Sequence, residues 1–197
     1  MHYLKIYENY QTEEEVAKIC QQYGIKNWSI NQDGLVDVTD NVDLSHKGLT
    51  KLPLKFGMVS GNFWCSYNKL TTLEGAPKSV DGSFICSWNK LTTLEGAPQS
   101  VSGGFWCSNN ELTNLEGAPQ SVDGDFFCNW NKLTTLEGAP YSVRGDFICN
   151  NNPLPDLIKK NMKWIKHIIA NQEMYHIYNK EGTINEYRFG LMMDSMD

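Results

Sequence analysis

Five cysteines are the residues whose type and spacing most invite a chemical interpretation. Cysteine thiols form disulfides and bind zinc, so a regular set of them raises both questions. Each follows the previous one by 21 residues, no Cys-x-x-Cys pair occurs, and no histidine lies at ligand spacing. We therefore expect buried thiols stacked in a repeat core, in a reducing compartment. They are Cys65, Cys86, Cys107, Cys128 and Cys149.

Other residues capable of chemistry are present but are not grouped for catalysis. The four histidines are scattered, and the sequence has no phosphate loop, metal cluster or nucleophile elbow. Acid–base catalysis needs carboxylates in different environments, whereas a repeat makes its glutamates alike. We expect no enzyme, no metal and no cofactor. Four glutamates also recur at the 21-residue spacing and form a column: Glu74, Glu95, Glu116 and Glu137. We expect this column to be a solvated face. The alternatives are that it recognises a basic partner or binds a cation.

A 21-residue repeat must form the elements that position these residues. The pattern G-x-F-x-C-x-x-N-x-L-T-x-L-E-G-A-P-x-S-V-x runs from Gly61 to Asn152 without slippage, and VDLSHKGLTKLP before it is a degenerate copy. One coil cannot bury its apolar side, but stacked coils bury a continuous one. We expect about six coils with this core set and its counterparts: Phe84, Cys86, Leu91, Leu94 and Val101.

The repeat resembles a leucine-rich repeat, L-x-x-L-x-L-x-x-N-x-L, with phenylalanine and cysteine replacing two leucines. It is similar to the short bacterial type, and such arrays also resemble uncharacterised bacteriophage proteins. The resemblance covers about residues 28–157. It implies an α+β repeat protein: a leucine-rich-repeat solenoid of about six 21-residue coils, with a parallel sheet on the concave face and α/β segments capping both ends. The repeat asparagines should satisfy backbone groups where each coil turns.

The segment before the array, residues 1–41, predicts an N-terminal cap made of a helix and a hairpin. Thr12 and Glu15 have the spacing of a capping box, and Gly24 should end the helix. WSINQDGLVDV should then form a hairpin that turns at Asp33–Gly34. The array itself should occupy residues 42–154.

The segment after the array, residues 155–197, predicts a C-terminal cap. A helix should start at Pro155 and run to about Asn171. A hairpin should turn at Glu181–Gly182, with a last helix from about Asn185 to Met193. The apolar residues of the first helix should cover the last coil: Leu157, Ile158, Trp164, Ile165, Ile168 and Ile169.

Two columns of larger residues should lie outside the core. If Phe84 and Cys86 point inward, Ile85 points outward, and the residue three positions later flanks the same face. These columns vary in residue type while the cysteine column does not, which indicates selection by something other than coil packing. An exposed stripe rich in Trp and Tyr is typical of an interaction site. The candidate partner-binding residues are Trp64, Tyr67, Ile85, Trp88, Trp106, Asn109, Phe127, Trp130 and Ile148.

Net charge and hydropathy narrow the class of partner. The chain carries a charge of −6, and the array from Gly61 to Cys149 has nine acidic and five basic residues. Direct nucleic-acid binding is therefore not expected. No run of about 18 apolar residues occurs, and MHYLKIYENYQTEEE has no apolar signal-peptide core. We expect a cytoplasmic protein with no membrane segment.

These features favour a non-catalytic scaffold that binds a protein partner through an aromatic concave face. The resemblance to phage proteins implies a bacteriophage inhibitor that acts on a host bacterial protein, such as a defence protein, in the host cytoplasm. The alternative is a structural or homo-oligomeric assembly protein, for example a homodimer, that uses the same face. Coverage of this face by the C-terminal segment and stacking of sugars on its rings are the other interpretations.

Overall fold

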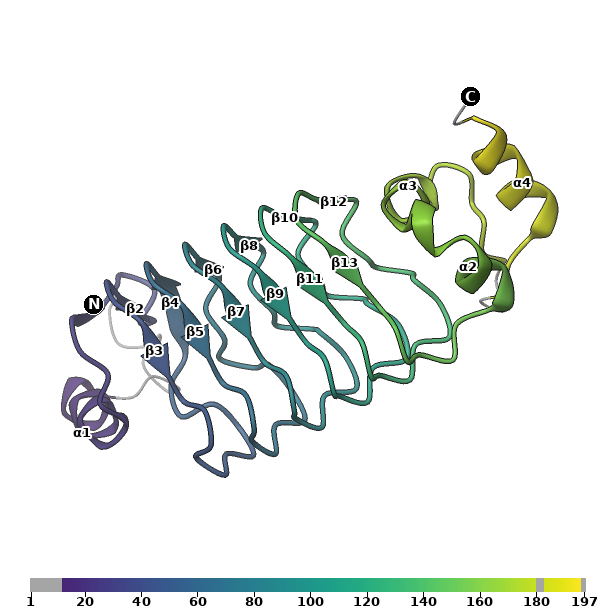
Figure 1. The fold of residues 1–197 in the computed structure, drawn as a ribbon. Coiled ribbons are helices and arrows are strands. Elements are labelled where there is room, and N and C mark those ends of the chain that lie inside the picture. Colours follow the sequence, from purple (N-terminus) through teal and green to yellow (C-terminus); the bar gives the residue numbers. More distant parts are fainter. Residues whose placement is uncertain (1–11, 180–182, 196–197) are drawn as a thin grey trace, which may run out of the picture.

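Two sheets run along the array, and the repeated coils contribute a short strand to each (Figure 1). The structure is a computed structural model that describes residues 12–179 and 183–195. Sheet B has six parallel strands in the order β13-β11-β9-β7-β5-β3. They are β3 (Val42–Asp43), β5 (Phe63–Trp64), β7 (Phe84–Ile85), β9 (Phe105–Trp106), β11 (Phe126–Phe127) and β13 (Phe147–Ile148).

Sheet A has seven strands in the order β1-β2-β4-β6-β8-β10-β12. The first two form the predicted antiparallel hairpin, and the other neighbours are parallel. A short bend separates sheet A from sheet B in each repeated coil. The strands are β1 (Trp28–Ile30), β2 (Val36–Val38), β4 (Phe56–Val59), β6 (Ser79–Val80), β8 (Ser100–Val101), β10 (Ser121–Val122) and β12 (Ser142–Val143).

The structure confirms the predicted repeat solenoid of about six coils with helices at both ends, and it adds sheet A to the single sheet that was expected. The second sheet forms because each coil has an extended segment at the same position, which is Ser-Val in β6, β8, β10 and β12. Stacking places equivalent extended segments side by side, so their backbone groups bond, as in the N–H of Lys78 donating to the carbonyl of Gly57 at 2.7 Å.

The core consists of stacked columns of identical residues, as predicted. The phenylalanine rings of sheet B stack on one another at 5.2–5.5 Å between centroids, from Phe63 to Phe147. The cysteine column beside them and the two leucine columns are buried throughout the array. Each coil thus covers the apolar side of its neighbours, which a single coil cannot do for itself.

An asparagine column ties adjacent coils together, also as predicted. The Asn110 amide donates to the carbonyl of Cys86 at 3.1 Å and to that of Cys107 at 3.0 Å. Its Oδ1 accepts from the N–H of Leu91 at 3.0 Å. One buried side chain therefore satisfies three backbone groups in two coils. The same pattern recurs at Asn68, Asn89, Asn131 and Asn152.

Helix α1 (Glu13–Tyr23) covers the N-terminal end of the array (Figure 1). The capping box is formed, because Thr12 Oγ1 accepts from the Glu15 N–H at 3.2 Å and Glu15 Oε2 accepts from the Thr12 N–H at 2.8 Å. Gly24 ends the helix with a left-handed φ of 69°. Cys20 lies on the buried side of the helix.

The C-terminal end is covered by four short helices, and this corrects the prediction of one helix from Pro155 to Asn171. The Asn161 amide donates to the carbonyl of Leu157 at 2.8 Å, and the helix breaks at Asn161. An asparagine that bonds the backbone in this way competes with helix continuation. The helices are α2 (Asp156–Lys160), the 3-10 helix η1 (Met162–Trp164), α3 (Ile165–Asn171) and α4 (Glu186–Asp194).

The break also changes which residues cover the last coil. Ile158 and Ile168 are buried as predicted, whereas Trp164 is 41% exposed, and the Lys163 ammonium lies 5.2 Å from its ring centroid. The predicted turn at Glu181–Gly182 lies outside the described residues, and a single bridge between Tyr178 and Ile184 precedes α4. Within residues 12–179 and 183–195, every helix is too short or too polar to cross a bilayer.

Candidate protein-interaction face

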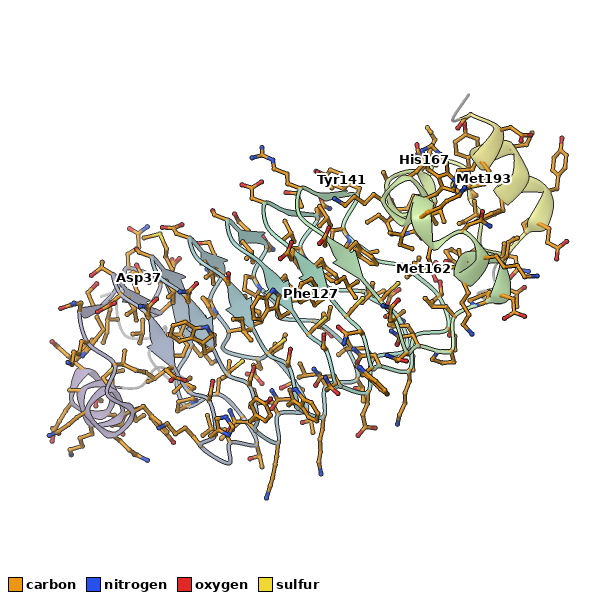
Figure 2. All side chains as sticks on the ribbon, in the orientation of Figure 1. Asp37, Phe127, Tyr141, Met162, His167 and Met193 are labelled. Carbon is orange, nitrogen blue, oxygen red and sulfur yellow. The ribbon has the colours of Figure 1, made fainter. Side chains whose placement is uncertain are left out.

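The strand column is the set of outward residues on sheet B. Parallel pairing places its members side by side, and Phe127 lies on β11, beside the last strand of the sheet (Figure 2). Trp106 is 36% exposed and the others are half-buried, because neighbouring side chains partly cover one another. The Trp106 and Phe127 rings stack at 5.5 Å. The column consists of Trp64, Ile85, Trp106, Phe127 and Ile148.

Gly104 leaves room for the indole of Trp106 to lie against the sheet. A Cβ added at Gly104 would lie 2.7 Å from Trp106 Nε1, so the indole lies directly over the glycine. The equivalent positions in the two preceding coils hold Asn62 and Ser83, whose side chains accept a hydrogen bond from the next coil. The missing side chain at Gly104 thus gives the indole room to lie against the sheet.

The turn column is the set of residues where the chain leaves sheet B, and its backbone is left-handed throughout. The φ angles lie between 56° and 58°, a region that bulky L-residues rarely adopt and that asparagine tolerates. Asparagine occupies two of the positions, but tyrosine and tryptophan occupy three. The column consists of His46, Tyr67, Trp88, Asn109, Trp130 and Asn151.

The rings of the turn column form an exposed ladder. His46 stacks on Tyr67 at 4.4 Å, and Tyr67 stacks on Trp88 at 5.5 Å, with ring planes within 10° of parallel. Trp88 is 50% exposed and Trp130 is 57% exposed. The structure therefore places five of the nine candidate residues side by side on sheet B and the other four in the turn column where the chain leaves that sheet. His46 was missed, although it precedes Tyr67 by one repeat length of 21 residues, which was the available signal.

The charged residues around the array are exposed and only loosely paired. The glutamate column of Glu74, Glu95, Glu116 and Glu137 is exposed, as predicted for a solvated face. Lys132, five residues before Glu137, pairs instead with Glu111, and its ammonium lies 2.9 Å from Glu111 Oε2. That contact holds the pKa of the Glu111 carboxyl below its ordinary value. Among the described residues, no group of three His, Cys, Asp or Glu side chains is placed to hold a metal ion.

Burial keeps the cysteine column in its neutral form. Desolvation raises the pKa of Cys65, Cys86, Cys107 and Cys128 well above the ordinary value of 9.0, and that of Cys149 to about 12. A neutral thiol is a poor nucleophile and a poor metal ligand. The chemistry that the cysteine spacing first suggested is therefore not that of a reactive site.

The three histidines in the described part of the chain do not belong to a metal-binding group. His46 belongs to the turn column, and His167 Nε2 lies 3.1 Å from the carbonyl of Met192 between α3 and α4. His176 lies in a turn with a φ of 49°. His2 lies outside the described residues.

Comparison with known proteins finds a likeness to a solved structure. No family model matches the chain, and no curated protein matches it. A solved structure described as "Structure of Shigella effector LRR domain" is similar, with a TM-score of 0.45 and 17% sequence identity over 77% of this chain and 81% of that one. This is a likeness of fold alone. The 21-residue coils, parallel sheets and asparagine column define the class of this protein as a solenoid of the leucine-rich-repeat type.

Proposed function

We propose that the protein is a non-catalytic interaction scaffold that binds a protein partner through the strand and turn columns of sheet B. The supporting observation is that exposed aromatic side chains occupy left-handed positions. Such a conformation costs a non-glycine residue roughly 1–2 kcal/mol, and Trp130 gains no ring stacking within the described chain to offset it. Strain that the folded chain does not need is typical of residues kept for binding.

The chemistry of the two columns fits a protein partner. Large rigid rings lose little entropy when they are covered, and Trp and Tyr dominate binding energy at protein interfaces, with costs of at least about 2 kcal/mol on truncation. The columns lie on a sheet that is held by a continuous core and by the asparagine column, so their positions are set before a partner arrives.

The finer proposal is that the protein is a bacteriophage inhibitor of a host bacterial defence protein and acts in the host cytoplasm. Its support is the resemblance of the G-x-F-x-C-x-x-N-x-L arrays to bacteriophage proteins, together with a face built to cover a protein surface. An inhibitor of this kind would block a site on its partner and would carry no catalytic group of its own.

A comparison of immobilised variants in bacterial lysate tests the proposal. Trp88→Ala/Trp106→Ala/Trp130→Ala should lose the proteins that the wild type recovers, and each recovered protein is then purified and its affinity for both forms measured. The matched control removes exposed apolar side chains elsewhere and should retain them. It is Met58→Ala/Tyr141→Ala/Tyr187→Ala, and Tyr141 lies apart from Phe127 in Figure 2.

Two outcomes would contradict the proposal. Equal recovery by the wild type and the triple tryptophan variant would remove this face from the function. A stable homodimer of the wild type that dissociates in the same variant, measured by light scattering in dilute solution, would make the protein a homo-oligomeric assembly protein. In that case the two columns would be covered by a second copy of the chain.

A further inference from the structure

The aromatic ladder of the turn column is interrupted at one coil. His46, Tyr67 and Trp88 stack in succession, and Trp130 stands two coils beyond Trp88, about 10 Å away along the parallel strands. Asn109 holds the position between them. Trp88 is covered by Tyr67 on one side, and within the described residues no ring contacts its other side or either side of Trp130. The position that a ring would fill therefore holds only the smaller side chain of Asn109.

The coil that contains Asn109 also differs from its neighbours at a second position, two residues further along the chain. Three coils carry lysine two residues after the turn column, at Lys69, Lys90 and Lys132, whereas this coil carries Glu111. The coil therefore exchanges an aromatic ring for an amide and a base for an acid. Both exchanges add hydrogen-bond acceptors, and the Asn109 side-chain amide makes no hydrogen bond in the described part of the chain.

We propose that this interruption receives the guanidinium group of an arginine from the partner protein; the proposal rests on the function proposed above. A guanidinium is flat and cationic and stacks on indole faces, here those of Trp88 and Trp130. Its N–H groups lie in the plane and would donate to Asn109 Oδ1 and to the Glu111 carboxylate. The chain's net charge of −6 also favours a cation.

Two other occupants satisfy the site less completely. An aromatic ring from the partner would stack between the indoles but would leave the two acceptors without donors. A lysine ammonium would supply donors and charge but has no flat face to stack. The ion pair between Lys132 and Glu111 does not block the site, because both side chains are solvent-exposed and such pairs are weak.

Nuclear magnetic resonance titration tests the proposal with defined probes. The probes are blocked Gly-Arg-Gly, Gly-Lys-Gly and Gly-Phe-Gly peptides added to the ¹⁵N-labelled protein. The arginine peptide should shift the indole N–H signals of Trp88 and Trp130 and the side-chain amide signal of Asn109, and it should saturate. The lysine and phenylalanine peptides should bind about tenfold more weakly, because each lacks one of the two kinds of contact.

A variant that fills the interruption supplies the control. Asn109→Trp/Glu111→Lys gives this coil the residues of the coils on either side, so it should fold with a melting temperature lowered by at most about 2–4 °C, and it should lose the preference for arginine. Equal binding of the arginine and lysine peptides, tighter binding of the phenylalanine peptide, no binding of the arginine peptide, or undiminished binding to the filled variant would each overturn the proposal.

The filled variant also separates this proposal from the proposed function. If it recovers from lysate every protein that the triple tryptophan variant loses, the face binds a protein but the arginine assignment is wrong. If the triple tryptophan variant loses nothing, the proposed function itself is wrong, whatever the peptides do.

Discussion

Adjacent residues of one strand meet opposite environments. Cys107 is fully buried, whereas Trp106 is 36% exposed over Gly104. Cys107→Ser should lower the free energy of unfolding by about 1–3 kcal/mol, because it buries a hydroxyl for which the core supplies no partner. Trp106→Ser should cost less, since it removes a partly solvated ring. Chemical denaturation of both variants measures the difference, and equal losses would contradict the assigned orientation of the strand.

A substitution at Trp130 should weaken partner binding without lowering the stability of the folded protein. Asn109 and Asn151 hold the same left-handed conformation in neighbouring coils, and asparagine tolerates it better than tryptophan. Trp130→Asn should therefore leave the free energy of unfolding unchanged or raise it by up to about 1 kcal/mol, while weakening recovery of the partner. A clear loss of stability in thermal denaturation would show that the folded chain itself needs this indole.

The buried thiols predict instability at alkaline pH. Because burial raises the pKa of Cys149 from 9.0 to about 12 and that of the other four repeat thiols well above 9.0, the unfolded chain releases these protons first. Their contribution is complete below about pH 9 and is lost as pH rises, by about 1.4 kcal/mol per pH unit for each thiol. Urea denaturation from pH 8 to 11 measures this slope, which should be shallower in Cys107→Ala.

The asparagine column acts at the level of the coil. Asn110→Ala would leave the N–H of Leu91 without a partner inside the array, whereas the carbonyls of Cys86 and Cys107 would each keep one amide donor, from Asn89 and Asn131 respectively. The free energy of unfolding should fall by about 1–3 kcal/mol, since one buried N–H is left unpaired. The adjacent Asn109→Gly is the matched control and should change little. A small effect of Asn110→Ala in denaturant titration would contradict the bonded role of the column.

The core and the coils could be predicted from the sequence because the repeat over-determines them. A period of 21 places Phe84, Cys86 and Leu91 in the same place in each coil, and only one strand orientation buries them. The ends repeat nothing, so local competition decides them. The side chain of Asn161 interrupts the expected helix, and Trp164 turns outward as a result.

The candidate face was only partly predictable. Alternation along the strand located Ile85 and its column, because side-chain direction in a strand has a period of two. The sequence gives no sign of a left-handed backbone in the turn column where tryptophan occupies it. The stacking of His46 on Tyr67 could therefore be found only from the structure. The sequence shows that Asn109 stands where neighbouring coils have an aromatic residue. That this change interrupts a ladder of rings can be recognised only when the positions of the rings on either side are known.

The whole molecule is a rigid array that presents two aromatic columns on one face, and solvent access to each tryptophan tests this most directly. A soluble paramagnetic agent broadens the indole N–H signals of exposed tryptophans in the ¹⁵N-labelled protein. The structure predicts strong broadening for Trp88 and Trp130, intermediate broadening for Trp106, whose Nε1 lies against Gly104, and weaker broadening for the half-buried Trp64. Protection of the first three indoles in dilute solution would show that the chain or a second copy covers this face, and would contradict its role as a free surface for a partner.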